Sequence, residues 1–231
     1  MKKKVLILGA SSDIGLIVAS YFLRENFEVY AHYNKSKPNI NSQNIKFLKY
    51  DFKNENSINK FLSKIKNIYF CSFINLIGYI DNKKIEETKL KILQDSLRVN
   101  FLTPILIGNY VARKMIKKNY GRLLHCSSIG VKFGGGINTY TYSLSKHCLE
   151  FIPSYYKNIS KHNILYNVLR IGVTNTKIHK KIPKKNLNNR ISKIPLKRIA
   201  KPEEIAKYIY YLCSDENSYI ANQILNISGG E

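Results

Sequence analysis

The sequence has no tryptophan, and its four cysteines form neither a Cys-x-x-Cys pair nor a Cys/His spacing suited to a metal. A chain of 231 residues can bury enough apolar surface to fold without disulfides or a structural metal. We therefore expect no metal site, and we expect the cysteines to be small apolar residues of a reducing compartment. They are Cys71, Cys126, Cys148 and Cys213.

Long hydrophobic runs are also missing, since no apolar stretch approaches the roughly 18 residues that cross a bilayer. The first run follows Lys2–Lys4 and resembles the start of a signal peptide. However, polar Ser11 and Ser12 end this run after about six residues, which is shorter than a usual signal-peptide core. We expect a cytoplasmic protein with no membrane partner.

Acidic residues are scarce: 15 Asp and Glu stand against 38 Lys and Arg, which gives a formal net charge of +23. The lysines are spread along the chain, and no RNP-like aromatic motif, zinc-finger spacing or helix-turn-helix accompanies them. We therefore expect no specific nucleic-acid partner. Attraction of an anionic substrate or carrier is one interpretation of the charge. The other interpretation is that the charge reflects a general bias of the composition toward Lys, Asn and Ile.

Apolar runs alternate with amphipathic stretches along the whole chain, which is typical of repeated βα units and a parallel sheet. Most of these runs are short and nearly continuous, as in strands that are covered on both faces. The predicted strands are Lys4–Leu8, Glu28–His32, Lys46–Tyr50, Tyr69–Leu76, Arg122–Cys126, Tyr166–Arg170 and Gln223–Ile227.

The amphipathic stretches predict helices, and Pro104 predicts a break or kink in the longest of them. We expect one domain, residues 1–231, with a basic segment at 176–195 that has few apolar residues and is predicted to form a substrate lid. The predicted helices are Ile14–Arg24, Ser57–Lys66, Lys89–Lys118, Tyr140–Lys161 and Pro202–Cys213.

The first predicted strand leads directly into Gly9-Ala10-Ser11-Ser12-Asp13-Ile14-Gly15 and then into a helix. Glycine allows the backbone to turn tightly and to approach a pyrophosphate, while a helix N-terminus offers free N–H groups. The pattern therefore predicts a dinucleotide-binding loop. A plain tight turn between strand and helix is the alternative.

The end of the second strand normally contacts the adenosine ribose, where a carboxylate favours NAD. This chain has Asn34-Lys35-Ser36-Lys37 there and no carboxylate. A lysine with Ser36 can pair with a 2′-phosphate, so NADP(H) is favoured and NAD(H) remains possible. Asp51 and Phe52, after the third strand, are predicted to bracket the adenine.

A Tyr-x-x-x-Lys pair places a phenol and an ammonium one helical turn apart. Four such pairs occur, so the pattern alone selects none of them: Tyr33/Lys37, Tyr79/Lys83, Tyr110/Lys114 and Tyr142/Lys146. Only Tyr142/Lys146 begins a predicted helix shortly after Ser128, which ends a strand, with Gly134-Gly135-Gly136 between. An ammonium stabilises phenolate, so we expect Lys146 to lower the pKa of Tyr142 and to make it an acid or base catalyst.

Together these motifs resemble the short-chain dehydrogenase/reductase family, and the resemblance covers essentially the whole chain. The matching segments are Gly9–Gly15 (with Asp13 at a usual glycine), Asn75–Gly78, Asn100, Ser128, Tyr142, Lys146, Asn167–Thr176 and the tail from Ile194 to Gly230. The resemblance implies a doubly wound Rossmann fold with a mostly parallel seven-stranded sheet and helices on both faces. It also implies a homo-oligomer, a dimer or tetramer, formed through the helices that hold Asn100 and Tyr142 and through the last strand.

The resemblance assigns roles to individual residues. Tyr142 would transfer the proton, Ser128 would orient the substrate oxygen, Lys146 would hold the nicotinamide ribose and Asn100 would anchor a water relay. The predicted cofactor contacts are Gly9, Ser11, Ser12, Asp13, Ile14, Gly15, Asn34, Lys35, Ser36, Asp51, Phe52, Asn75, Gly78, Tyr142, Lys146, Gly172, Val173 and Thr176.

The predicted function is an NAD(P)H-dependent oxidoreductase that interconverts a carbonyl and an alcohol, similar to 3-oxoacyl-acyl-carrier-protein reductases. Lys117, Lys118 and Lys161 are candidates to surround the site mouth and dock an acidic carrier protein, unless they are merely solvated. A sugar or nucleotide-sugar dehydrogenase of the same family is the first alternative. A non-catalytic regulatory protein that binds NADP(H) is the second.

Overall fold

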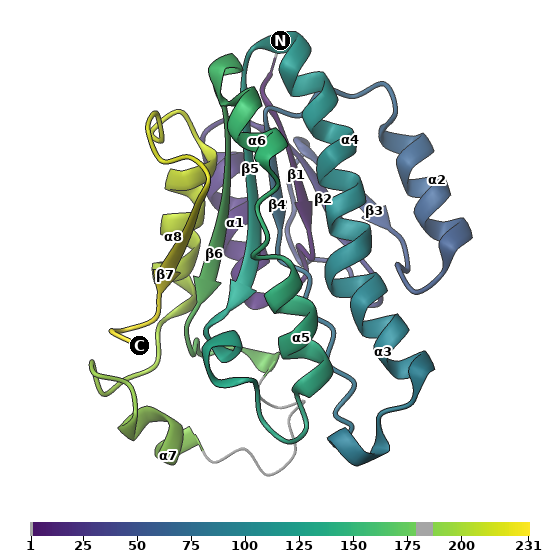
Figure 1. The fold of residues 1–231 in the computed structure, drawn as a ribbon. Coiled ribbons are helices and arrows are strands. Elements are labelled where there is room, and N and C mark those ends of the chain that lie inside the picture. Colours follow the sequence, from purple (N-terminus) through teal and green to yellow (C-terminus); the bar gives the residue numbers. More distant parts are fainter. Residues whose placement is uncertain (1, 179–186) are drawn as a thin grey trace.

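The computed structural model describes residues 2–178 and 187–231 and shows one seven-stranded parallel sheet (Figure 1). The strand order is β3-β2-β1-β4-β5-β6-β7, and every neighbouring pair is parallel. The predicted doubly wound fold is therefore confirmed. The strands are β1 Lys4–Leu8, β2 Glu28–Tyr33, β3 Ile45–Lys49, β4 Ser72–Asn75, β5 Gly121–Ser128, β6 Ile164–Ile171 and β7 Gln223–Ile227.

Helices cover both faces of the sheet, because the five inner strands are almost entirely buried. Helices α1 and α8 pack behind the sheet in Figure 1, and α2, α4, α5 and α6 pack in front of it. The helical elements are α1 Asp13–Arg24, α2 Glu55–Ile65, Ile85–Glu87 (3-10), α3 Leu90–Leu97, Arg98–Leu102 (π), α4 Thr103–Lys118, Ile129–Phe133 (3-10), α5 Tyr140–Cys148, α6 Ser154–Ile159, Ser160–His162 (3-10), α7 Leu187–Ser192 and α8 Pro202–Cys213.

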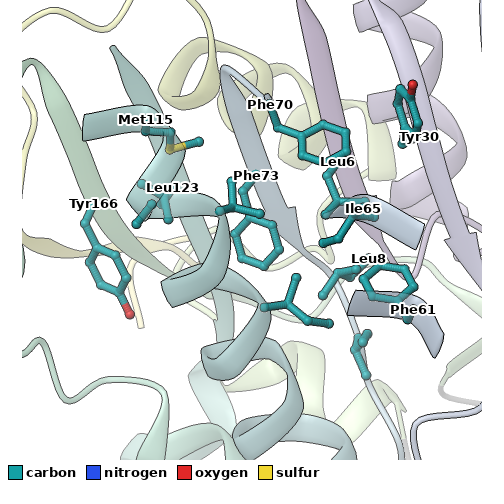
Figure 2. Packing of buried hydrophobic residues seen from close by; sticks show 14 of the residues in the cluster. Leu6, Leu8, Tyr30, Phe61, Ile65, Phe70, Phe73, Met115, Leu123 and Tyr166 are labelled. Carbon is teal, nitrogen blue, oxygen red and sulfur yellow. The ribbon is translucent and has the colours of Figure 1, made fainter. Parts of the chain in front are cut away.

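The front core is built around large buried side chains. One buried cluster contains Phe61 of α2, Phe73 of β4, Met115 of α4 and Tyr166 of β6 (Figure 2). Complete burial of each such side chain stabilises the fold by roughly 1.5–3 kcal/mol. This core fixes the helices of the front face relative to the carboxyl ends of the strands.

The predicted helix Lys89–Lys118 is interrupted in the structure, as the expected break near Pro104 implied. The interruption is the π-helical turn Arg98–Leu102, between α3 and α4. Pro104 lies in the first turn of α4, directly after the π-helical turn, and it has no N–H to donate to that turn. The π-helical turn contains Asn100, and such turns are frequent at functional sites.

The prediction of one continuous helix over Tyr140–Lys161 is wrong. Helix α5 ends at Cys148, and α6 begins only at Ser154. Pro153 lacks the N–H that would continue the helix, and its ring restricts the residue before it to extended conformations. Pro153 itself is extended, with φ −60° and ψ 141°.

Cys71, Cys126 and Cys213 are buried as predicted, while Cys148 is only partly buried, and all four carry free thiols. Within the described residues, no helix is long and apolar enough to cross a membrane.

The direction of strand succession reverses between β1 and β4, the two central strands of the sheet. The chain adds β2 and β3 on one side of β1 and later adds β4 to β7 on the other. Crossover connections leave on opposite sides here, so a crevice opens outside the carboxyl ends of the two strands. The strand ends at this point are Leu8 and Asn75, which are paired in register.

Candidate active site

A cavity of about 1590 Å³ lies at this edge of the sheet. It joins the phosphate loop, the end of β2, the end of β5, the first half of α5 and the segment after β6. The predicted site residues that line it are Gly9, Ser11, Ser12, Asp13, Ile14, Asn34, Lys35, Ser36, Asp51, Phe52, Gly78, Ser128, Tyr142, Lys146, Gly172, Val173 and Thr176. Gly15, Asn75 and Asn100 are not part of the lining.

The phosphate loop is shaped by two glycines. Gly9 has φ +77°, and a Cβ there would lie 3.0 Å from the carbonyl carbon and oxygen of Leu76. A Cβ on Gly15 would lie only 2.6 Å from the carbonyl oxygen of Gly9. Gly15 therefore allows α1 to start close to β1, although it does not itself reach the cavity.

The N-terminus of α1 lies at the cavity, because Ser12, Asp13 and Ile14 line it. Ser12 caps the helix, and its Oγ accepts a hydrogen bond from the Gly15 N–H at 3.0 Å. The tight glycine turn and the open helix end fit the pyrophosphate of a dinucleotide. Asp13 occupies the position of a usual glycine and binds the segment after β6, because its Oδ2 accepts from the Lys177 N–H at 2.7 Å.

His32 supports the same loop, and the sequence reasoning did not single it out. The Gly9 N–H donates to its Nδ1 at 3.3 Å, and its Nε2 lies 3.0 Å from the Tyr50 carbonyl oxygen. Burial lowers the pKa of His32 to about 4, so the ring is neutral at pH 7. Phe52 stacks on this ring at a centroid distance of 4.2 Å. Phe52 is buried and lines the part of the cavity where we expect the adenosine.

Lys35 and Ser36 line the adenosine end, whereas Lys37 does not. The Lys37 ammonium instead lies over the Phe47 ring, 4.4 Å from its centroid. Asp51 is held by the Lys53 N–H at 3.0 Å and by the Asn34 side-chain amide at 3.3 Å. Of the two lysines considered for a 2′-phosphate, the structure brings only Lys35 to the cavity.

Tyr142 lies in the first turn of α5, beside Ser128, and both side chains line the cavity. The ring is partly accessible from the cavity. Burial raises the pKa of Tyr142 to about 12, and the neighbouring Ser128 hydroxyl opposes this rise. Ser128 is itself held at the end of β5, because its Oγ accepts from the Gly130 N–H at 3.1 Å.

Lys146 does not lower the pKa of Tyr142 in this structure, contrary to the prediction. The ammonium lies 5.8 Å from the centre of the Tyr142 ring. It donates to the carbonyl oxygens of Ile77 and Cys126, each at 2.6 Å. Lys146 is 2% exposed, and burial lowers its pKa to about 8. An ammonium has three donors, so one remains for a ligand in the cavity.

Asn100 is fully buried behind the cavity rather than in its wall. Its Oδ1 accepts from the Tyr79 N–H at 2.8 Å, and its Nδ2 donates to the Tyr79 carbonyl at 2.9 Å. Nδ2 also donates to Ser145 Oγ at 2.9 Å, and Ser145 Oγ donates to the Tyr142 carbonyl at 2.7 Å. Asn100 thus links the segment after β4 to α5.

Asn75 likewise turns into the protein. Its Oδ1 accepts from the Ile77 N–H at 3.1 Å, and its Nδ2 lies 3.3 Å from His125 Nδ1. These contacts shape the strand end whose Ile77 carbonyl receives Lys146. Asn75 therefore supports the site without lining it.

A buried cluster behind Ser128 was missed at the level of sequence. Ser127 Oγ donates to Glu150 Oε1 at 2.8 Å and approaches the Lys146 carbonyl at 3.2 Å. Arg170 binds both oxygens of Glu150, at 2.7 and 2.6 Å. Charge-assisted bidentate pairs of this kind fix geometry well, so the ends of β5, α5 and β6 are held together. The only sequence signal was a lone acid and a lone base in apolar segments.

Lys117, Lys118 and Lys161 do not surround the mouth of the site, contrary to the prediction. Lys117 and Lys118 end α4 just before β5 begins, and Lys161 lies just before β6. The strands point downward in Figure 1, and α4 ends at the opposite, upper edge of the sheet. His162 Nδ1 lies 2.9 Å from Asn119 Oδ1, which joins the two turns at that edge.

A doubly wound parallel sheet with a glycine loop and a Tyr-x-x-x-Lys helix on one cavity is the arrangement of a nicotinamide-dependent oxidoreductase. A family model described as "Enoyl-(Acyl carrier protein) reductase" matches residues 9–231. The chain belongs to the short-chain dehydrogenase/reductase family of NAD(P)-dependent oxidoreductases.

Relatives of known name agree with this assignment. The 3-oxoacyl-[acyl-carrier-protein] reductase FabG of Aquifex aeolicus is 31% identical over 76% of this chain and 72% of its own length. FabG of Thermotoga maritima is 28% identical over 99% of this chain and 97% of its own length.

Solved structures show the same fold. The structure of ElxO with NADP bound matches with a TM-score of 0.83 and 25% identity, over 100% of this chain and 98% of its own. A 4-hydroxyisoleucine dehydrogenase complexed with NADH matches with a TM-score of 0.87 and 24% identity, over 99% of this chain and 98% of its own. The residues present thus fit a nicotinamide dinucleotide. The neighbours bind NADP in one case and NADH in the other, so the fold does not determine which of the two this chain prefers.

Proposed function

We propose that the protein is an NADPH-dependent ketoreductase that reduces a 3-oxoacyl group or a similar ketone to an alcohol. One observation carries the proposal: Tyr142 and Ser128 line the same cavity as the phosphate loop. A reductase needs a proton donor beside the dinucleotide, and this arrangement provides one. The FabG relatives support the substrate class.

When bound, NADPH supplies the hydride to the carbonyl carbon. Tyr142 donates the proton to the carbonyl oxygen, and its pKa of about 12 keeps the phenol protonated at neutral pH. Ser128 hydrogen-bonds the same oxygen and orients it. Lys146 uses its remaining N–H on the nicotinamide ribose, while the carbonyls of Ile77 and Cys126 hold its ammonium. Asn100 positions α5 and the segment after β4.

A spectrophotometric panel tests the proposal. NADPH and NADH are each combined with a β-ketoacyl thioester, a simple ketone and a nucleotide-sugar, and nicotinamide absorbance is followed. We expect consumption of NADPH with the thioester. Turnover of the nucleotide-sugar alone would instead support the hypothesis of a sugar or nucleotide-sugar dehydrogenase. Binding of NADPH without turnover of any compound would support a regulatory protein.

Preference for NADPH is expected to depend on Lys35. The change Lys35→Glu should lower the ratio of kcat/KM for NADPH to that for NADH by about 10- to 100-fold, because a charge-assisted bond to the 2′-phosphate contributes about 1.5–3 kcal/mol. Lys37→Glu is the matched control, since Lys37 lies on Phe47 outside the cavity. A wild-type enzyme with equal rates for both cofactors would contradict this reading of Lys35.

We also propose that the protein resides in a reducing, cytoplasmic compartment, and the four free thiols support this location. In addition, we propose that it forms a homo-oligomer. Large apolar side chains are exposed on and beside the helices that hold or follow Asn100 and Tyr142: Leu102, Leu106, Phe151 and Tyr155. Their burial between copies would remove apolar surface from water.

Light scattering is expected to give a dimer or tetramer for the wild type and a smaller species for the double variant Leu102→Lys/Leu106→Lys. The double variant Asn56→Lys/Asn59→Lys serves as the control, because it adds the same two charges at exposed positions of α2, outside the proposed interface. A monomeric wild type would refute the oligomer.

A further inference from the structure

Arg190 of α7 is a lining residue of the cavity that none of the family motifs uses. Its guanidinium forms an ion pair with Glu231 and lies over the Phe133 ring, 5.4 Å from the ring centroid. Phe133 follows Ser128 in the 3-10 turn after β5. Arg190 is thus connected to the segment that carries the substrate-orienting serine.

Glu231 is the more deeply buried member of the ion pair with Arg190. Its side chain is 3% exposed, whereas that of Arg190 is 22% exposed. The tail before it is docked firmly, because Gly229 and Gly230 have φ +70° and +98°, and a Cβ on Gly230 would lie 2.9 Å from the Pro195 side chain. Leu196 N–H also donates to the Gly229 carbonyl at 3.1 Å.

The guanidinium has N–H donors to spare. It carries five, and among residues 2–178 and 187–231 Glu231 is its one acidic partner. The ion pair joins one guanidinium nitrogen to one oxygen of Glu231, so the remaining N–H groups of Arg190 are not used by this carboxylate. Because the side chain is partly exposed and lines the cavity, these groups are available to a ligand.

The charge of the surrounding wall favours an anion. Lys132 and Lys193 line the cavity together with Arg190. In the described part of the chain the lining carboxylates are Asp13, Asp51 and Glu231. Asp13 is bound to Lys177, and Asp51 belongs to the adenosine end. The region near Arg190 therefore keeps a net positive charge after Glu231 is counted.

We propose that Arg190, oriented by Glu231 and flanked by Phe133, binds an anionic group of the ketone substrate, a carboxylate or a phosphate. Lys193 and Lys132 add to the positive potential of this subsite. The proposal rests on the proposed reductase function and specifies its substrate class as an anionic ketone.

Two matched substrate pairs test the proposal and separate the sources of the anion. Acetoacetate is compared with neutral acetoacetamide, and acetoacetyl-4′-phosphopantetheine is compared with acetoacetyl-pantetheine. The readout is the ratio of kcat/KM for the anionic member to that for the neutral member. In at least one pair the wild type should favour the anion, and Arg190→Gln should lower that ratio about tenfold or more, as expected for loss of a charge-assisted bond.

Further variants separate recognition from folding or overall charge. Arg190→Lys keeps the charge but loses the planar fork, so it should restore only part of the ratio. Glu231→Gln should lower the ratio by a smaller factor than Arg190→Gln. Lys161→Gln removes one charge at the opposite edge of the sheet and should leave the ratio unchanged. Equal ratios in the wild type and Arg190→Gln would overturn the proposal.

Binding measurements keep this test independent of turnover. If none of the four ketones is reduced, the proposed function fails, and the subsite is then tested by calorimetry. Acetoacetate and 4′-phosphopantetheine are titrated into the wild type and Arg190→Gln, with acetoacetamide and pantetheine as the neutral partners. Tighter binding of an anion that is lost in Arg190→Gln would support the subsite. Equal affinities for anionic and neutral partners would refute it.

Discussion

Replacing Tyr142 by phenylalanine is expected to lower kcat for ketone reduction by about 10²–10⁴-fold, the range that a general acid contributes. The change removes only the hydroxyl beside Ser128 and leaves the ring that lines the cavity. The dissociation constant for NADPH should therefore stay nearly unchanged. Steady-state kinetics and fluorescence titration of NADPH measure the two effects separately.

A matched control exists elsewhere in the chain. Tyr110 and Lys114 form another Tyr-x-x-x-Lys pair, but they lie on α4 away from the cavity lining. Tyr110→Phe should leave kcat unchanged. If Tyr142→Phe reduced ketones as fast as the wild type, Tyr142 would not be the proton donor.

The rate of reduction is expected to fall as the pH rises through about 8, because Lys146 then loses its charge. Burial lowers the pKa of Lys146 from its ordinary value to about 8, so the ammonium is present below this pH and is lost above it. The Tyr142 phenol, with its pKa raised to about 12, stays protonated across the same range. Buried His32 and His125, with pKa values lowered to about 4 and 3, stay neutral.

Variants of Lys146 test whether this residue causes the fall in rate at alkaline pH. Lys146→Arg should move the alkaline limb of kcat/KM upward, since a guanidinium keeps its charge. Lys146→Met should lower kcat/KM by about 10²-fold or more, because it removes the cation beside the nicotinamide ribose. Lys114→Met should change neither property. An alkaline limb that stays at the same pH in Lys146→Arg would contradict the assignment.

The sheet and the phosphate loop could be predicted from sequence because their signals are local. Continuous apolar runs indicate strands that are covered on both faces, and Gly9 after the first run marks the turn that the structure shows with positive φ. The break after Cys148 was also within reach, because Pro153 stood in the predicted helix.

Contacts between distant segments could not be predicted in this way. Asn100 and Asn75 were correctly placed near the cofactor edge of the sheet, but their side chains turn into the protein to bind Tyr79 and His125. Likewise, the ion pair of Arg190 with Glu231 depends on how the tail docks. The raised pKa of Tyr142 arises from burial, and Lys146, which was expected to lower this pKa, is not among its causes.

The direction of a helix decides which edge of the sheet its ends reach. Helix α4 precedes β5, so Lys117 and Lys118 had to lie at the edge where β5 begins. The cofactor binds at the edge where strands end. The topology alone thus separates these lysines from the site and directs attention to Lys132, Lys193 and Arg190, which line the cavity.

A single-turnover reaction tests the central claim most directly. Excess enzyme is mixed with NADPH and a smaller amount of a 3-oxoacyl thioester, and nicotinamide absorbance and product are followed together. The account predicts that one equivalent of NADPH is oxidised for each 3-hydroxyacyl product formed, and that Tyr142→Phe binds NADPH but oxidises it far more slowly. Binding of NADPH without oxidation by the wild type, with every ketone offered, would contradict the assignment of a reductase.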